Sequence, residues 1–297
     1  MKRNRIKLIS TILISMLLII NMVACGKKDS VIVVGGKDYS EQYIMSQMMS
    51  ILIEENTDLK TTVKDNFSGR VIFQTINSGD VDLYLEYAGS GLSNMKIDLD
   101  DEPDVLLEKL EKGFADRDIK WLESYGFSNT YAMVVTQETA EKYDLETVSD
   151  LAAVGDELVI GTDYTFAERT DGYPGLIEAY DFEFKELKGM DASLMYQAVE
   201  QGDVDVISGY STEGRIAMFD LVILEDNKNF FPPYDAAPVI RQEVLDEHPE
   251  LEDVLNKLAN RIDDEKMAEL NARVDLDEEE PEDVARDFLV EEGLIGE

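Results

Sequence analysis

Four tyrosines stand where the sequence predicts strand ends or crossings between two halves of the chain: Tyr87, Tyr131, Tyr210 and Tyr234. Aromatic faces attract cations at about 0.5–2 kcal/mol per favourable contact, and a quaternary ammonium group has no N–H to hydrogen-bond. Lys37 and Arg169 stand at predicted helix starts, where they could bind a carboxylate. These residues predict a site for a zwitterion with a quaternary nitrogen and a carboxylate. The alternative is that the 13 tyrosines of the chain are mostly core or interface residues with satisfied hydroxyls.

One sequence pattern occurs twice and supplies two of these tyrosines. Residues 73–87, FQTINSGDVDLYLEY, return as residues 196–210, YQAVEQGDVDVISGY. In both copies a helical turn ends at a Gly, which adopts the left-handed conformation without steric cost, and a short apolar run follows. The pattern predicts helix, tight turn and strand in two similarly built halves. Chance recurrence is the alternative, because this helix-to-strand connection is common in α/β proteins.

The charge of the chain excludes one class of partner. The 297 residues include 64 Asp and Glu but 27 Lys and Arg, for a formal net charge of −37. Because these few basic residues cannot neutralise a run of phosphates, we expect no nucleic-acid binding. Two dense acidic runs, at residues 98–104 and 275–283, predict solvated loops. Calcium binding is the weaker alternative, since neither run has the Gly-punctuated spacing of an EF-hand.

Cysteine and histidine are too rare for several kinds of chemistry. The chain has one of each, Cys25 and His248. Disulfide frameworks, zinc sites built on Cys and His, and Cys-His pairs are therefore excluded. His248 precedes a predicted helix in an acidic stretch, where an exposed linker residue is a better interpretation than a catalytic base. We expect neither a metal, nor a cofactor, nor an enzyme.

The N-terminus predicts export and a lipid anchor. Four basic residues lie within residues 1–7, and residues 8–20 form an apolar run too short for a comfortable membrane span of ~20 residues. The run ends at Met22-Val23-Ala24-Cys25-Gly26, which resembles the bacterial lipoprotein cleavage box although Met22 stands where Leu is commonest. We predict a signal over residues 1–25 with lipidation at Cys25, and a tether over residues 26–30. An uncleaved anchor or an ordinary signal with an incidental Cys is the alternative.

Alternating strands and helices must position the tyrosines and the basic residues. Strand, helix and strand follow each other from residue 31, and that order predicts a parallel sheet with ligands at its strand ends. Segments near residues 121–135 and 230–235 are interpreted as two crossings between lobes. We therefore predict an α/β protein whose first lobe comprises residues 31–133 and 236–297, and whose second lobe comprises residues 134–235.

The first predicted helix start would suit an anion. Gly35 and Gly36 turn the chain from a strand into a helix, with Ser40 or Asp38 as the expected cap. Backbone N–H groups at a helix N-terminus favour negative charge, and Lys37 adds a full positive charge at the same place.

Six ordered motifs resemble those of the glycine betaine/choline-type osmoprotectant-binding proteins of ABC importers, the ProX and OpuC branch. The resemblance runs from about Val31 to the C-terminus and implies a two-lobed periplasmic-binding-protein fold (type II), with the ligand in a cleft that closes by hinge motion. The motifs are GGKDYSEQ at 35–42, GDVD at 79–82, EYAGSG at 86–91, GFSNTYA at 126–132, YSTEGR at 210–215 and FPPY at 231–234.

The resemblance implies roles for individual residues. The four tyrosines match the cage that surrounds the quaternary ammonium group in this family. Lys37, Ser90 and Arg169 match the positions that contact the ligand carboxylate or its polar groups, and Thr212 of the YSTEGR motif is expected to add a polar contact. Ser90 stands where Thr is usual, and Asn129 stands where some members have an acid that supports the cation. Because choline-preferring members often lack the basic residue found here as Lys37, the sequence favours a carboxylated ligand.

The expected function is that of an extracytoplasmic lipoprotein that binds glycine betaine or a related betaine and delivers it to an ABC permease with its ATPase. We expect a monomer attached to the cell membrane by its lipid. A receptor that prefers choline or carnitine, and a sensory surface protein that uses the same cleft, are the alternatives. An enzyme acting on choline-like esters or amines is disfavoured by the scarcity of His and Cys.

Overall fold

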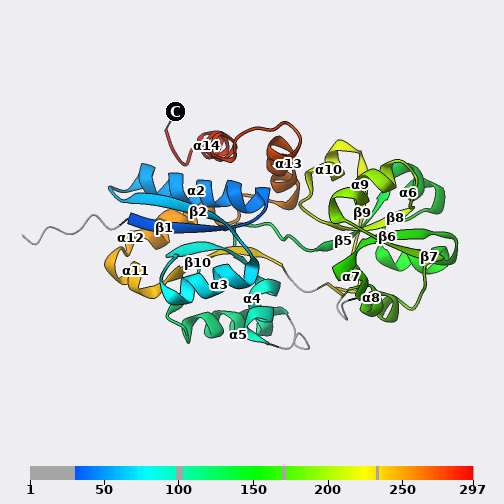
Figure 1. Ribbon diagram of the computed structural model, residues 1–297, viewed down its shortest axis with the longest axis horizontal. Helices are drawn as coiled ribbons and strands as arrows, with labels where there is room; N and C mark the ends of the chain where they lie inside the picture. The colour runs from blue at the N-terminus through cyan, green and yellow to red at the C-terminus, as the bar shows by residue number, and fades with distance from the viewer. Residues whose placement is uncertain (1–30, 98–102, 169–171, 232–233, 297) are drawn as a thin grey trace, which may run out of the picture.

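The computed structural model describes residues 31–97, 103–168, 172–231 and 234–296. The predicted signal, Cys25 and the tether lie outside the described residues, and so does Arg169. The described chain forms two lobes that lie side by side along the long axis of the molecule (Figure 1). Each lobe contains a five-stranded sheet of its own, which confirms the predicted two-lobed α/β architecture.

The first lobe is built on a sheet of order β2-β1-β3-β10-β4. Strand β1 is parallel to β2 and β3, whereas β10 runs antiparallel to β3 and β4. The β-branched run at the start of β1 suits a central strand that is covered on both faces. The strands are β1 (Val31–Lys37), β2 (Lys60–Phe67), β3 (Leu83–Tyr87), β4 (Ile119–Trp121) and β10 (Ala236–Arg241).

Helices cover both faces of this sheet (Figure 1). The 17-residue helix α2 (Ser40–Asn56) is apolar around much of its circumference, as expected for a helix buried between the sheet and the C-terminal helices. It packs with the C-terminal helices on one face, while α3 to α5 cover the other. The remaining helices are α3 (Gly69–Ser78), α4 (Ala88–Met95), α5 (Pro103–Ala115), α11 (Gln242–Glu247), α12 (Glu250–Leu255), the 3₁₀ turn η3 (Asn256–Leu258), α13 (Asp264–Asp275) and α14 (Pro281–Glu291).

The second lobe repeats this plan with a sheet of order β7-β6-β8-β5-β9. Here β6 is parallel to β7 and β8, and β5 is antiparallel to β8 and β9. The strands are β5 (Tyr131–Thr136), β6 (Val159–Asp163), β7 (Glu186–Met190), β8 (Val206–Tyr210) and β9 (Leu221–Leu224). The helices are α6 (Gln137–Tyr143), the 3₁₀ helices η1 (Val148–Ala153) and η2 (Gly155–Glu157), α7 (Tyr164–Glu168), α8 (Tyr173–Tyr180), α9 (Ala192–Glu200) and α10 (Gly214–Met218).

The repeated sequence unit forms the same structure in both lobes. In each copy a Gly with positive φ lies between the helix and the strand: Gly79, with φ 84°, is the C-cap of α3, and Gly202, with φ 76°, follows the C-cap Gln201 of α9. The second Asp of each copy then accepts a hydrogen bond from the backbone N–H at the start of the neighbouring parallel strand. The Val33 N to Asp82 Oδ2 distance is 2.8 Å, and the Val159 N to Asp205 Oδ2 distance is also 2.8 Å. The prediction of two similarly built halves is therefore confirmed.

Two crossings connect the lobes. The first ends where β5 begins at Tyr131, and because β5 pairs with β8 of the second sheet, the boundary predicted after Met133 falls inside a strand of the second lobe. That prediction placed the boundary too late, because the apolar run at residues 131–135 gives no sign of which sheet it joins. The second crossing ends before β10 at Ala236, and the two crossings touch through a bridge between Ser128 and Asp235.

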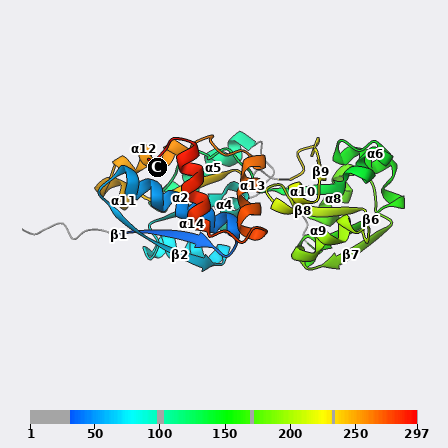
Figure 2. The ribbon, with the colours of Figure 1, turned by 90° about the horizontal axis from the view of Figure 1, so that it is seen from above.

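A third contact between the lobes comes from the C-terminal part of the chain. Helix α13 lies between the body of the first lobe and α10 of the second (Figures 1 and 2). At Gly214 a Cβ atom would lie 2.7 Å from both the Cα and the N of Ala272, so only a residue without a side chain permits this approach without a shift. The two helices therefore meet backbone to backbone.

No helix within the described ranges is long and apolar enough to cross a membrane.

Candidate functional site

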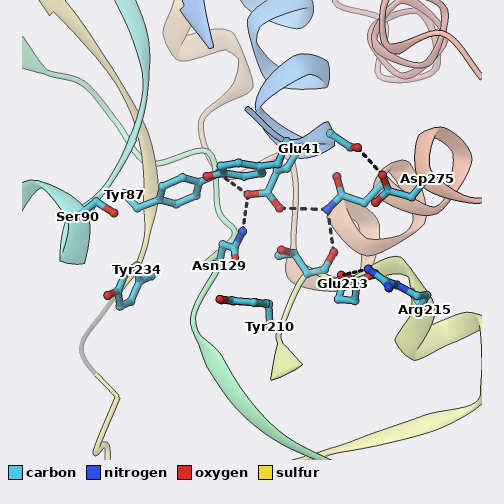
Figure 3. A pocket seen from close by; sticks show the side chains of 13 residues that line it. Glu41, Tyr87, Ser90, Asn129, Tyr210, Glu213, Arg215, Tyr234 and Asp275 are labelled. Atoms are coloured by element: carbon cyan, nitrogen blue, oxygen red, sulfur yellow. Dashed lines mark hydrogen bonds and ion pairs between the residues drawn. The ribbon is translucent and has the colours of Figure 1, made fainter. Parts of the chain in front are cut away.

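A cavity of about 500 Å³ lies between the lobes, at the end of β3 in one lobe and of β8 in the other. Figure 3 shows that its walls come from α2, from both repeated units, from the crossings and from α13. This agrees with the expectation that ligands bind at the carboxyl ends of parallel strands. The described lining residues are Tyr39, Ser40, Glu41, Tyr87, Ser90, Asn129, Tyr210, Thr212, Glu213, Arg215, Tyr234, Asn271 and Asp275.

Tyr87 is a buried aromatic residue of the wall with two hydrogen bonds at its hydroxyl. It ends β3 and is only 3% exposed. Its hydroxyl donates to Glu41 Oε1 at 2.5 Å and accepts from Gln42 Nε2 at 3.0 Å. Burial and the adjacent Glu41 carboxylate raise the pKa of this phenol well above its usual value, so the hydroxyl stays protonated and able to donate.

Tyr234, in the second crossing, packs closely against a glycine of the first lobe. A Cβ atom at Gly89 would lie 2.6 Å from Cζ of the Tyr234 ring, so any side chain at position 89 would displace the ring. Ser90, the next residue of α4, also lines the cavity. The sequence motif EYAGSG therefore supplies a ring, a space for a second ring and a hydroxyl within four residues.

Tyr210 and Tyr131 lie opposite each other on paired strands. They are partners in the β5–β8 register, and their ring centroids are 5.0 Å apart. Tyr131 also packs on Phe166 at 4.8 Å and on Phe231 at 6.2 Å, and it is not among the described residues that line the cavity. In this structure Tyr131 supports Tyr210 within an aromatic cluster of the second lobe.

Glu41 places a buried carboxylate in the wall of the cavity. It lies in the first turn of α2, is 2% exposed and accepts hydrogen bonds from Tyr87, from Asn129 Nδ2 at 3.0 Å and from Asn271 Nδ2 at 3.1 Å. Burial raises the pKa of this carboxyl group, and the hydrogen bonds it accepts oppose that rise. The negative charge that suits this helix N-terminus is therefore supplied by the protein itself.

Two further polar groups connect the lobes at the cavity. Thr212, a predicted site residue, lines the cavity, and its backbone carbonyl accepts from Asn271 Nδ2 at 2.8 Å. Asn271 thus donates to both lobes, since it also donates to Glu41. The next residue, Glu213, binds Arg215 at 2.7 Å, so the one described basic side chain of the wall is already paired.

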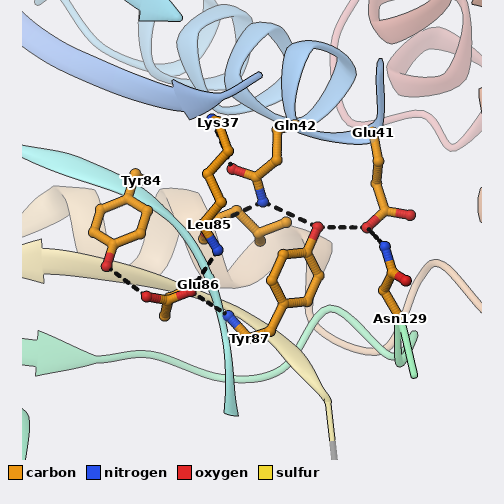
Figure 4. A network of polar contacts seen from close by, with 8 residues as sticks. All are labelled: Lys37, Glu41, Gln42, Tyr84, Leu85, Glu86, Tyr87 and Asn129. Carbon is orange, nitrogen blue, oxygen red and sulfur yellow. Dashed lines mark hydrogen bonds and ion pairs between the residues drawn. The ribbon is translucent and has the colours of Figure 1, made fainter. Parts of the chain in front are cut away.

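Lys37 does not lie where the sequence interpretation placed it. Its Nζ is 2.5 Å from Glu86 Oε1, both side chains are almost fully buried, and Lys37 is not among the described lining residues (Figure 4). The sequence could not show this ion pair, because Glu86 lies one residue before Tyr87 on a strand that is distant in the chain. The helix cap was also misjudged: Ser40 Oγ donates to Asp275, and Asp38 accepts from the Tyr43 hydroxyl, so neither side chain caps α2.

The structure thus gathers most of the predicted site residues and adds some that sequence reasoning missed. Tyr87, Ser90, Tyr210, Thr212 and Tyr234 line one cavity, whereas Tyr131 and Lys37 lie behind ring residues and Arg169 falls outside the described residues. The missed lining residues include Tyr39, Glu41 and Asn271; Asn129, which the sequence marked only as a departure from the family pattern, also lines the cavity.

A signal for Glu41 existed, since it belongs to the motif at residues 35–42. Asn271 gave none, because nothing in a helical acidic stretch marks a residue that reaches the cleft.

The described walls carry more negative than positive charge. Their carboxylates are Glu41, Glu213 and Asp275, and their basic group is Arg215. Aromatic faces with a buried carboxylate suit an organic cation that offers no hydrogen-bond donor. Among the described residues, no group of three or more His, Cys, Asp or Glu could hold a metal ion.

Comparisons with known proteins agree with this geometry. The chain is 38% identical over 298 residues to the carnitine transport binding protein OpuCC of Listeria monocytogenes, covering 97% of each chain. It is 36% identical to the ergothioneine transport permease/ergothioneine binding protein EgtU of Helicobacter pylori, covering 89% of this chain and 48% of that one.

A solved structure described as a glycine betaine/carnitine/choline ABC transporter superimposes with a TM-score of 0.85 and 38% identity, over 89% of this chain and 99% of that chain. Residues 30–291 match the family described as the substrate binding domain of the ABC-type glycine betaine transport system. The chain belongs to this family of transport substrate-binding proteins.

Proposed function

We propose that this protein is the extracytoplasmic receptor of an ABC importer and binds a quaternary ammonium compatible solute in the cleft between its lobes. The observation that carries the proposal is a single cavity where Tyr87, Tyr210 and Tyr234 stand beside the buried carboxylate Glu41. Rings and carboxylate together attract a cation that is too alkylated to donate hydrogen bonds. The relatives named above bind ligands of this kind, which supports the same assignment.

In the proposed complex the trimethylammonium group lies among the three rings, and Tyr131 keeps Tyr210 in place from behind. The polar end of the ligand meets Ser90, Asn129 and Thr212. Arg169 remains our candidate for the ligand carboxylate on the strength of its motif alone. Lys37 pairs with Glu86 in this structure and is not among the described lining residues, so its contact with the ligand carboxylate likewise rests on its motif.

Choline or carnitine is the second candidate ligand. For choline, the observation in favour is the surplus of carboxylates in the described wall, because choline is net positive and gains more from Glu41 than a neutral zwitterion such as glycine betaine or carnitine does. A hydroxyl group on the ligand could also donate to the side-chain oxygens of Ser90 or Thr212.

Titration calorimetry with matched ligand pairs tests the proposal. Glycine betaine, carnitine and choline should bind, whereas 3,3-dimethylbutanoate and 3,3-dimethylbutanol, which replace the charged nitrogen by carbon at the same shape, should not. Equal affinity for choline and its uncharged isostere would show that the cavity recognises shape alone and would overturn the proposal. A Tyr210→Leu variant should weaken all quaternary ligands and leave the isosteres as they were.

The location and the partners complete the proposal. Lipidation at Cys25 would hold the receptor at the outer face of the cell membrane, next to a permease and its ATPase. We propose that the receptor acts as a monomer. Cys25→Ala protein should be released into the medium after signal cleavage, while wild-type protein stays in the membrane fraction. Membrane retention of the processed Cys25→Ala variant would contradict the anchor.

A further inference from the structure

We propose that Asn271 is a positioning residue that ties the buried carboxylate of Glu41 to Thr212 of the second lobe, so that closure of the lobes and placement of this carboxylate occur together. The inference rests on the proposed function, because it takes the cavity in Figure 3 to hold a quaternary ammonium ligand. It assigns a role to a residue that no sequence motif marked. The contacts of Asn271 with both lobes carry it.

Three residues form a closed set of contacts across the seam between the lobes. Glu41 in α2 and Asn271 in α13 belong to the first lobe, whereas Thr212 follows β8 of the second. The Asn271 Nδ2 donates to Glu41 Oε2 at 3.1 Å and to the Thr212 carbonyl at 2.8 Å, and an amide N–H₂ group has two hydrogens for this purpose. The Thr212 side chain is also hydrogen-bonded to Glu41. First-lobe residues therefore hold Thr212 by its carbonyl and by its side chain.

All three residues are buried: Glu41 and Thr212 are 2% exposed, and Asn271 is 6% exposed. At a buried site water cannot replace a lost hydrogen bond unless the site itself opens. Because Asn271 bonds both lobes, opening the cleft breaks at least one of its two bonds, whichever lobe α13 accompanies. The three contacts therefore favour the closed arrangement of the lobes.

Packing alone does not explain an amide at position 271. Among the described residues, the Asn271 Oδ1 is buried and has no hydrogen-bond partner. A buried amide oxygen without a partner costs free energy, and a leucine, which has the same branched shape, would avoid that cost. The amide is therefore retained here for the two bonds that its Nδ2 donates.

The same contacts help to keep the Glu41 carboxyl group ionised. Burial raises its pKa, and the hydrogen bonds that it accepts, including those from Thr212 and Asn271, oppose the rise. Loss of the Asn271 donor alone should therefore raise the pKa of Glu41 further. The other described titratable groups of the wall and of the adjoining strands are Tyr39, Tyr87, the pair Lys37–Glu86, Asp275 and the pair Glu213–Arg215.

The first experiment compares Asn271→Leu with Asn256→Leu. Asn256 also donates to a glutamate, Glu123 Oε1 at 3.3 Å, but both of these residues belong to the first lobe. Calorimetry with glycine betaine and with choline should show that Asn271→Leu weakens both ligands about 2- to 10-fold, because less of the protein is in the closed, binding-competent form. Asn256→Leu should change neither affinity. Unchanged affinity of Asn271→Leu for both ligands would overturn the inference.

The second experiment tests the bond to Glu41 through the pH dependence of choline binding. Choline favours the ionised carboxylate, and Asn271→Leu removes a donor that holds the pKa of Glu41 down. Affinity should therefore begin to fall at a higher pH in Asn271→Leu than in wild type, whereas Asn256→Leu should keep the wild-type profile. A wild-type profile in Asn271→Leu would mean that this residue does not act on Glu41.

The third experiment tests the bond to the second lobe. In a Glu41→Gln background the carboxylate is gone, but Asn271 still donates to the Thr212 carbonyl. Asn271→Leu should therefore weaken glycine betaine in this background too. No further loss there would mean that Asn271 only orients Glu41, and would overturn the tie between the lobes.

These outcomes separate the inference from the function on which it rests. Wild-type protein that binds no quaternary ammonium ligand would overturn the proposed function and the inference together. Wild-type protein that binds such ligands, together with an Asn271→Leu variant that keeps full affinity and the wild-type pH profile, would overturn only the role of Asn271. Weakened binding of both ligands, with the pH profile shifted upwards, is the result we expect.

Discussion

The two lobes share one repeated unit, but the contacts at the two ends of that unit differ between them. At the edge away from the cleft, Arg241 of the first lobe lies over Gly79 and binds Asp82 Oδ1 at 3.2 Å. The register places Thr136 at the matching position of the second lobe, and no atom of the described residues lies within 4 Å of a Cβ atom built at Gly202 there. A surface hollow of about 510 Å³ lies there instead, lined by Thr136, Gly202, Asp205 and neighbouring residues.

At the cleft the same contrast concerns the cage rings. The first lobe holds Tyr87 by an ion pair from behind and by two hydrogen bonds at its hydroxyl. The second lobe holds Tyr210 by a tilted ring contact with Tyr131 and leaves it partly exposed. The difference teaches that one half of the cleft is rigid before ligand arrives, whereas the other half relies on aromatic packing.

The largest effect should distinguish the two rings by stability. Tyr87→Ala removes a buried ring of the first-lobe core and should lower the free energy of unfolding of ligand-free protein by about 3–5 kcal/mol. Tyr210→Ala should cost roughly 1 kcal/mol, because this ring is partly exposed already. Urea unfolding monitored by circular dichroism gives both values. Equal losses would mean that the two rings are held alike.

Charge at the cleft provides the next test. Glu41→Gln should weaken choline binding about tenfold, close to 1.4 kcal/mol, since the buried carboxylate of the first lobe is lost. The second-lobe carboxylate Glu213 is neutralised by Arg215, so the neutral double variant Glu213→Gln/Arg215→Met should keep wild-type affinity. A comparable loss in the double variant would show that the cleft does not depend on Glu41 in particular.

The same residue predicts a pH dependence. Burial raises the pKa of Glu41, and a cationic ligand favours the ionised carboxylate. Wild-type affinity for choline should therefore be highest above that pKa and should fall as the pH is lowered through it, towards the value of Glu41→Gln. Calorimetry at several pH values checks this, and a Glu41→Gln profile that falls in parallel would assign the effect to another group.

A smaller effect concerns the edge away from the cleft. Arg241→Ala should lower the free energy of unfolding by about 1 kcal/mol, a value reduced by the partial exposure of the Arg241–Asp82 pair. Arg286→Ala, which removes an exposed pair with Glu55 at 3.3 Å, is the matched control and should change little. If both variants lose the same amount, the contact at Gly79 adds nothing to an ordinary surface pair.

The smallest effect on stability is expected from placing an Arg at position 136 of the second lobe, the position that corresponds to Arg241 of the first. Thr136→Arg and Thr136→Ala both lose the hydroxyl that caps α6 by accepting from Thr139 N at 3.1 Å. Arg at this position could reach Asp205, so the Arg variant should be more stable than the Ala variant by a few tenths of a kcal/mol. Thermal unfolding in low salt measures the difference, and an Ala variant that is as stable as the Arg variant would break the correspondence between the lobes.

Most of the fold could be predicted from local patterns in the sequence. The recurrence of Gly-Asp-Val-Asp and the apolar run of β1 each lie in residues that are near each other in the chain, and each formed the predicted element. The lobe boundary at β5 was harder, because strand pairing is decided by residues far away in the sequence. The pattern of apolar residues predicts that a segment is a strand, but it does not show which of the two sheets the strand joins.

The site divides along the same line. The tyrosines at strand ends could be predicted because one short motif contains both the end of the strand and the aromatic residue that could bind a cation. The partner of Lys37 could not, since Glu86 lies 49 positions away and only the pairing of β1 with β3 brings the two side chains to 2.5 Å. Asn271, which donates to residues 230 and 59 positions away, is beyond any local pattern.

Gly214 of the second lobe and Ala272 of the first are in direct contact, because a Cβ atom at position 214 would lie 2.7 Å from the Ala272 backbone. Neither Gly214 nor Ala272 lines the cavity, yet their contact joins the two lobes whose residues do. Apparent affinity scales with the fraction of molecules in the binding-competent form, so a side chain at position 214 would act as a wedge that weakens every ligand equally. Affinity in this receptor can therefore be tuned from outside the cavity, while the rings that give it selectivity stay as they are.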